Sequence, residues 1–207
     1  MNIVLCGDSY YDFDDRYPGL HWADQLDPHM VYRLARGGAS NFSIYHQIQH
    51  AKFFNPDLVL ISFTSIARIE YSKQPFDQFD LRLPLEYIDK QWLYRNTMYK
   101  NIEHANPGYN TQQYINWMPY YIEEFESIKN GIFIKQSLDQ LTKENIKFYY
   151  TLGGYNGSFD LGTHAQFDIL PNSWNHSEKL SDPYFHIQDH KWHADHAEFI
   201  LNLITLW

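Results

Sequence analysis

The sequence has few of the features that mark several common classes of protein. Its 207 residues include one cysteine, Cys6, so the chain can form no internal disulfide and offers no cysteine pair to a metal ion. Cys6 lies within an apolar run, where cysteine is usually a small buried hydrophobic residue. No apolar run approaches the roughly 20 residues of a membrane-spanning helix. The N-terminus also lacks the basic and apolar regions of a signal peptide. We therefore expect a cytoplasmic protein with no membrane partner.

Positive charge is scarce as well. The chain has 16 Lys and Arg residues against 25 Asp and Glu, which gives a net charge of −9, and its basic residues are scattered along the sequence. Proteins that bind nucleic acid usually present a basic face to the phosphates, so nucleic acid is not an expected partner. Hydrophobic residues make up 44% of the chain and predict a globular fold. Aromatic residues reach 18%, and we expect most in the core and a few in a binding cleft.

Apolar runs that alternate with helical patterns predict an α/β fold with a parallel sheet. Residues 70–120 lack clean periodicity and are rich in Tyr, Gln, Asn and Pro, which suggests an insertion or lid. We therefore expect a single domain over residues 1–207 with this insertion at about 70–120. The predicted strands are residues 2–6, 30–34, 57–63 and 146–152, with a possible short strand at 167–170. The predicted helices are residues 20–26, 42–53, 121–144 with a break or kink near Gly131, and 193–206.

Small and polar residues follow three of the predicted strands. These segments are Gly7-Asp8-Ser9, Gly37-Gly38 and Thr64-Ser65, and the carboxyl ends of parallel strands are where such sheets usually carry their sites. Ser9 on its own is compatible with an ordinary turn or with a nucleophile on an exposed turn. A nucleophilic serine also needs a histidine to take its proton and N–H donors aimed at the developing oxyanion.

Histidines are concentrated near the end of the chain, in the stretch YFHIQDHKWHADHAEFI. His190, His193 and Asp195 have a spacing that could also suit a zinc site. That alternative is disfavoured because the segment is short and no HExxH motif exists. A general base that returns from a C-terminal loop to the first strand is the simpler interpretation.

With these segments together, the chain resembles the GDSL/SGNH hydrolase family. The family carries its nucleophile after the first strand, here in Gly7-Asp8-Ser9-Tyr10, and an oxyanion-hole glycine after the second, here Gly38. Its third block usually reads Gly-x-Asn-Asp, whereas this chain has SFTSIAR, with Ser65 where the asparagine is expected. In the last block, His190 stands six residues before His196, as in the family. The resemblance implies a flavodoxin-like three-layer α/β/α sandwich with a five-stranded, mostly parallel sheet.

The resemblance also implies the chemistry of a serine hydrolase that acts on ester bonds without a metal or cofactor. Ser9 would attack the ester carbonyl, His190 would carry the proton, and Asp189 is the nearest acid that could orient His190. The oxyanion hole would comprise the N–H groups of Ser9 and Gly38 together with the Ser65 hydroxyl.

Several assignments remain open from the sequence. His193 is the alternative base, with Asp189 four residues before it, and His196 is expected to be structural. The Thr64 hydroxyl could replace that of Ser65 as the oxyanion donor. A backbone carbonyl could orient His190 in place of an acid, which would make Ser9 and His190 a dyad. The substrate could be an O-acetylated carbohydrate. Acyl transfer from the same site, or a binding protein that has lost catalysis, are the alternative functions.

Overall fold

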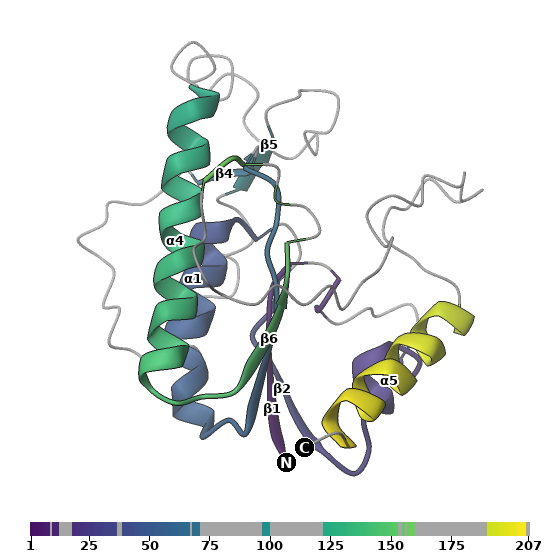
Figure 1. Cartoon of the computed structure of the whole chain (residues 1–207). Helices are drawn as coiled ribbons and strands as arrows, with labels where there is room; N and C mark the ends of the chain where they lie inside the picture. The colour runs from purple at the N-terminus through teal and green to yellow at the C-terminus, as the bar shows by residue number, and fades with distance from the viewer. Residues whose placement is uncertain are drawn as a thin grey trace, which may run out of the picture.

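Four parallel strands form the centre of the computed structural model of the chain (Figure 1). The structure describes residues 1–8, 10–12, 18–36, 39–66, 68–70, 97–99, 122–152, 155, 157–159 and 190–205, with the backbone alone at 68–70, 97–99 and 190–192. The strands are β1 (Asn2–Cys6), β2 (Met30–Arg33), β3 (Leu58–Ser62) and β6 (Phe148–Thr151), in the order β2-β1-β3-β6. This is the strand order of flavodoxin-like sheets.

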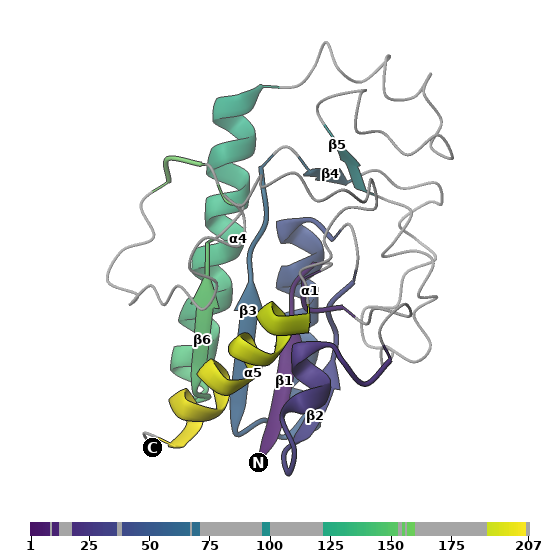
Figure 2. The same cartoon turned by 90° about the vertical axis from the view of Figure 1, so that its right-hand side faces the viewer.

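Helices cover both faces of the sheet, so the predicted three-layer α/β/α architecture is confirmed. The helices α1 (Asn41–Ala51) and α4 (Glu123–Lys143) pack on one face. The helix α5 (His190–Thr205) and the short 3-10 helix η1 (Trp22–Gln25) pack on the other face, which Figure 2 views from the front. A second 3-10 helix, η2 (Lys52–Phe54), follows α1 directly.

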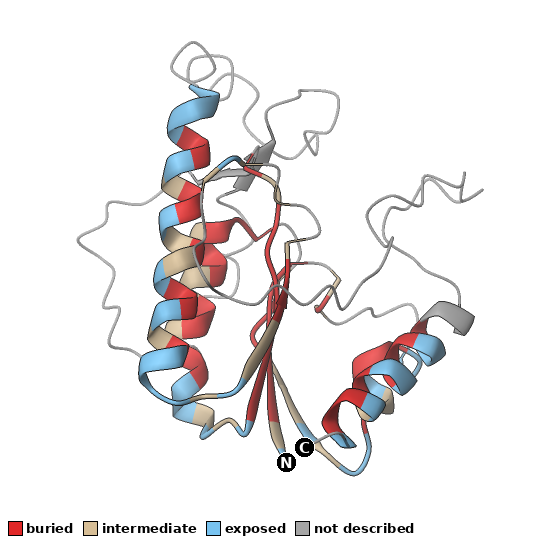
Figure 3. Ribbon diagram, in the orientation of Figure 1, coloured by how far each residue is buried: buried red, intermediate tan, exposed pale blue. Residues whose placement is uncertain are grey.

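The core explains why β1 and β3 read as continuous apolar runs. All five residues of β3 are buried, and so are Ile3 to Cys6 of β1, because both strands lie in the interior of the sheet with helices above and below. Alternate residues of these strands face opposite layers: Ile3 and Leu5 face α5 and η1, while Val4 and Cys6 face α1 and α4. Figure 3 shows the same pattern in the helices, whose buried sides face the sheet.

The sheet differs from the prediction in its strand count. Five strands were predicted, and the described residues form four in the central sheet. The possible strand at 167–170 lies outside the described residues. The strand β4 (Arg68–Glu70), at the edge of the predicted insertion, and β5 (Thr97–Tyr99), within it, form a separate antiparallel pair. Within the described part of the chain, no helix has the length and apolar content that crossing a membrane requires.

Three helices also differ from the pattern that the sequence predicted. The helix α4 is continuous through Gly131, where a break or kink was expected. The glycine has a packing reason instead, because a Cβ at this position would overlap the side chain of Phe159. The predicted helix at 20–26 is shortened to η1. The last helix starts at His190 rather than near residue 193, so His190 is a helical residue and not part of a loop.

Candidate active site

The strand order places a topological switch point between β1 and β3. The chain passes from β1 to β2 on one side of the sheet and later returns to β3 on the other side of β1. Ligands of such sheets bind outside the carboxyl ends of the two strands that flank the switch point. The segments that leave those ends are Gly7-Asp8 and Thr64-Ser65. The position of the site predicted from the sequence therefore agrees with the topology.

Asp8 organises the turn that follows β1. Its side chain is fully buried, and its two carboxylate oxygens accept hydrogen bonds from the Tyr10 backbone N–H and the Thr64 hydroxyl, both at 3.3 Å. Its backbone carbonyl accepts from the N–H groups of Tyr11 and Asp12, both at 3.1 Å. A helical turn thus begins directly at the end of the strand. Ser9 is part of this segment in the sequence, although Ser9 itself lies outside the described residues.

Gly7 is held by hydrogen bonds with α1 and with the segment after β2, and it lies close to β3. Its N–H donates to Gln47 Oε1 at 2.6 Å, and its carbonyl accepts from Gln47 Nε2 and from the Arg36 backbone N–H, each at 3.1 Å. A Cβ at this position would stand 3.0 Å from the Cβ of Ser62 and 3.1 Å from its carbonyl oxygen. Glycine is therefore favoured here, because a side chain would push the ends of β1 and β3 apart by a few tenths of an ångström.

Asn41 fixes the end of β3. Its side-chain amide donates to the Thr64 carbonyl at 2.8 Å and accepts from the Thr64 N–H at 2.9 Å, and it also donates to Asn130 Oδ1 of α4 at 2.9 Å. The N-cap of α1 is the preceding residue, Ser40, whose hydroxyl accepts from the Ser43 N–H at 3.2 Å. Asn41 therefore fixes the backbone of Thr64, which follows β3.

The two hydroxyl groups after β3 have different environments. Thr64 is fully buried and donates its hydroxyl to the Asp8 carboxylate. Ser65 is half-buried. The Thr64 hydroxyl is therefore engaged with Asp8, and the oxyanion donor that the sequence predicted at Ser65 stays a prediction.

His193 is bound to η1 through its ring. Its Nδ1 accepts a hydrogen bond from the Trp22 backbone N–H at 3.2 Å, and the buried ring lies 5.1 Å from the ring of His21, centre to centre. In the neutral ring the proton is therefore on Nε2, and the lone pair of Nδ1 is occupied. This geometry disfavours His193 as the general base; His190, the other candidate, is the first residue of α5 and its role stays a prediction.

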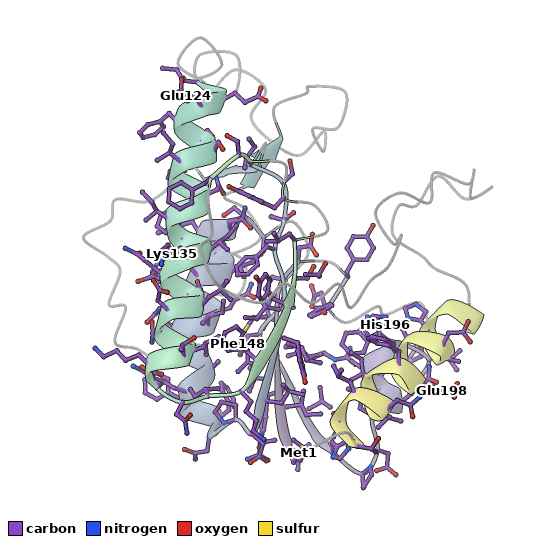
Figure 4. The ribbon with its side chains drawn as sticks, in the orientation of Figure 1. Met1, Glu124, Lys135, Phe148, His196 and Glu198 are labelled. Carbon is purple, nitrogen blue, oxygen red and sulfur yellow. The ribbon has the colours of Figure 1, made fainter. Side chains whose placement is uncertain are left out.

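His196 has the structural environment that the sequence predicted. It is buried against Trp22, with ring centres 4.8 Å apart in an edge-to-face arrangement. Figure 4 shows His196 on the side of α5 that faces the sheet, whereas Glu198 points away from it. Burial, with a smaller contribution from His193, lowers the pKa of His196 from 6.5 to about 3.

We expect the pH dependence of folding stability to report this depressed pKa. The stabilisation from a neutral His196 is fully present above pH 6.5 and is lost as the pH falls towards about 3. Over this range His196 is protonated in the unfolded chain and stays neutral in the folded chain. The loss approaches about 1.4 kcal/mol per pH unit. Between about pH 7.5 and about pH 4.5, the free energy of unfolding measured in urea should fall less steeply in His196→Phe than in the wild type. His29→Gln, outside this cluster, is the control, and equal slopes in all three proteins would contradict the assignment.

The remaining predicted residues cannot be placed in the site directly. Ser9, Gly38, Asp189 and the side chain of His190 lie outside the described residues, so their roles stay predictions. Among the side chains that the structure describes, no three histidine, cysteine or carboxylate groups lie close enough together to hold a metal ion. The sequence analysis missed the roles of Asp8 and Gln47. The preference of aspartate for turns was the only local signal for Asp8, and none existed for Gln47.

Several solved structures are similar to this chain, among them an esterase and a putative lipolytic protein. An acetyl xylan esterase matches with a TM-score of 0.37 and 13% identity over 73% of this chain, and the chain spans 57% of the length of that enzyme. A putative lipolytic protein of the G-D-S-L family from Desulfitobacterium hafniense DCB-2 matches with a TM-score of 0.38 and 12% identity over 98% of both chains. No protein-family model and no curated protein matches the sequence.

Proposed function

We propose that the chain is a serine hydrolase of carboxylic esters, with Ser9 as nucleophile and His190 as general base. Ser9 Oγ attacks the carbonyl carbon while its proton passes to His190. His190 then gives that proton to the departing alkoxide, which leaves an acyl group on Ser9. A water molecule, deprotonated by His190, attacks the acyl-enzyme; the bond between the acyl carbon and Ser9 Oγ breaks, His190 returns the proton to Ser9 Oγ, and the carboxylic acid is released. Asp189 orients His190 in this proposal.

The contact between α5 and the segment after β1 is the observation that carries the proposal. Two hydrogen bonds of Trp22 link these parts of the chain: its indole N–H donates to the Tyr10 carbonyl at 3.1 Å, and its backbone N–H donates to His193 at 3.2 Å. Tyr10 follows Ser9 in the sequence, and His193 is one helical turn beyond His190. Trp22 therefore links the residue after Ser9 to the helical turn after His190, although these two candidates are about 180 positions apart in sequence.

The proposed oxyanion hole combines the backbone N–H groups of Ser9 and Gly38 with the hydroxyl of Ser65. The described surroundings support this set because Asn41 and Asp8 hold the end of β3 and the turn after β1 next to each other through Thr64. A fixed donor is effective because it needs no reorganisation as charge develops, and removal of one donor typically costs about 2.7–4 kcal/mol. Ser65 would supply the side-chain donor in place of an asparagine.

Turnover of a small activated ester tests this function. We expect the purified protein to release nitrophenolate and free acetate from 4-nitrophenyl acetate, and acetate from an O-acetylated sugar if carbohydrate esters are its substrates. An added sugar alcohol distinguishes hydrolysis from acyl transfer, since transfer would give an acetylated alcohol in place of acetate. A folded protein that releases acetate from neither substrate would contradict the proposal.

A further inference from the structure

We propose that His21 and Trp22 are positioning residues for this reaction, and that they hold the start of α5 in register with the turn that carries the nucleophile. The inference rests on the proposed roles of Ser9 and His190. It assigns a function to η1 and its N-cap, which lie outside the four sequence blocks of the site.

Both side chains donate to the same backbone carbonyl. Trp22 Nε1–H donates to the Tyr10 carbonyl at 3.1 Å. His21 Nδ1 accepts from the Ala23 N–H at 3.2 Å as the N-cap of η1, so the proton of the neutral ring is on Nε2. That Nε2 lies 3.3 Å from the Tyr10 carbonyl and donates to it. The two lone pairs of one carbonyl oxygen, one residue beyond Ser9, are therefore used by two side chains of the same segment.

The same two residues also contact the first turn of α5. The Trp22 backbone N–H donates to His193 Nδ1, and the rings of His21 and His193 lie 5.1 Å apart. The Trp22 ring packs edge-to-face against His196 of the next turn and, at 5.0 Å, against Tyr11. His21 and Trp22 thus contact both the segment after β1 and the first turn of α5, which the proposed reaction must align.

A purely structural role would not need these polar groups. Trp22 is fully buried and His21 is 3% exposed, and a phenylalanine at position 22 could fill most of the same apolar space. The indole and imidazole N–H groups instead add directional bonds, which fix a backbone position more closely than apolar packing does. Such precision matters because a serine and its base must approach to about 2.6–3.2 Å.

Two substitutions remove these bonds selectively. Trp22→Phe keeps an aromatic ring and loses the indole N–H, while His21→Asn keeps a good N-cap acceptor for Ala23 and is too short to reach Tyr10. The matched control is Ile200→Val in α5, which removes apolar volume from the same core and no hydrogen bond. Activity on 4-nitrophenyl acetate is compared at equal concentrations of folded protein, with thermal unfolding measured on each variant.

We expect kcat to fall about 10- to 100-fold in Trp22→Phe and in His21→Asn. KM should stay within about twofold, because the substitutions disturb the alignment of Ser9 and His190 and not substrate binding. Ile200→Val should lower the melting temperature and leave kcat unchanged. An unchanged kcat in both variants, an equal fall in Ile200→Val, or a change confined to KM would overturn the inference. Ser9→Ala separates the two claims: if it retains activity the proposed function fails, whereas its inactivity beside fully active Trp22 and His21 variants refutes the positioning role alone.

Discussion

Ser9→Ala is expected to lower kcat/KM for 4-nitrophenyl acetate by at least about 10³-fold, since the substitution removes the nucleophile and leaves only binding and oxyanion stabilisation. The substitution should leave the fold intact. The described contacts that shape this turn come from the Asp8 carboxylate and from the backbone groups of Asp8, Tyr10, Tyr11 and Asp12. The melting temperature of Ser9→Ala should therefore match that of the wild type.

A second serine supplies the control for this experiment. Ser158 is exposed and lies on the loop beyond β6, where its backbone N–H donates to the Ser127 hydroxyl. Ser158→Ala keeps that backbone donor and should retain full activity. Residual turnover of Ser9→Ala close to the wild-type rate, in a sample shown to be free of a contaminating esterase, would contradict the role of Ser9.

His190→Gln is expected to have the second largest effect, with kcat lowered by at least about 10³-fold, because it removes the proposed acceptor of the Ser9 proton. His193→Gln should behave differently. His193 accepts a hydrogen bond from Trp22, and a glutamine carbonyl oxygen can also accept one. We expect His193→Gln to be less stable than the wild type and to keep activity within about tenfold of it.

The pair of variants identifies the base by comparison. Added imidazole offers a further check, since it should restore part of the activity to His190→Gly and none to Ser9→Ala. A greater loss of activity in His193→Gln than in His190→Gln would show that His193 is the base and that its contact with Trp22 is not present during turnover.

Local apolar patterns were sufficient to predict the four strands of the central sheet. β1 and β3 are buried on both faces, so nearly every residue in them is apolar, and that signal can be read without knowledge of the rest of the chain. Of the break or kink predicted near Gly131, the break is absent, because glycine, a weak helix former, is used there to admit Phe159 from a distant segment. A tertiary contact of that kind leaves no mark in the helix sequence itself.

The supporting residues of the site were hidden from sequence reasoning for the same reason. Gln47 binds Gly7 from 40 positions away, and Asn41 binds Thr64 from 23 positions away. Neither bond follows a periodicity or a turn motif, since each depends on how α1 packs against the sheet. The glycine and serine after β1 could be recognised because turn chemistry is local, whereas the contacts that hold this turn are not.

The most direct test of the central claim is the reaction of the folded protein with a fluorophosphonate, followed by peptide mapping in the mass spectrometer. The account predicts one adduct, located on Ser9, with labelling abolished in Ser9→Ala, strongly slowed in His190→Gln and absent after unfolding in urea. An adduct on a different residue, or ester hydrolysis that continues while Ser9 remains unlabelled, would contradict it.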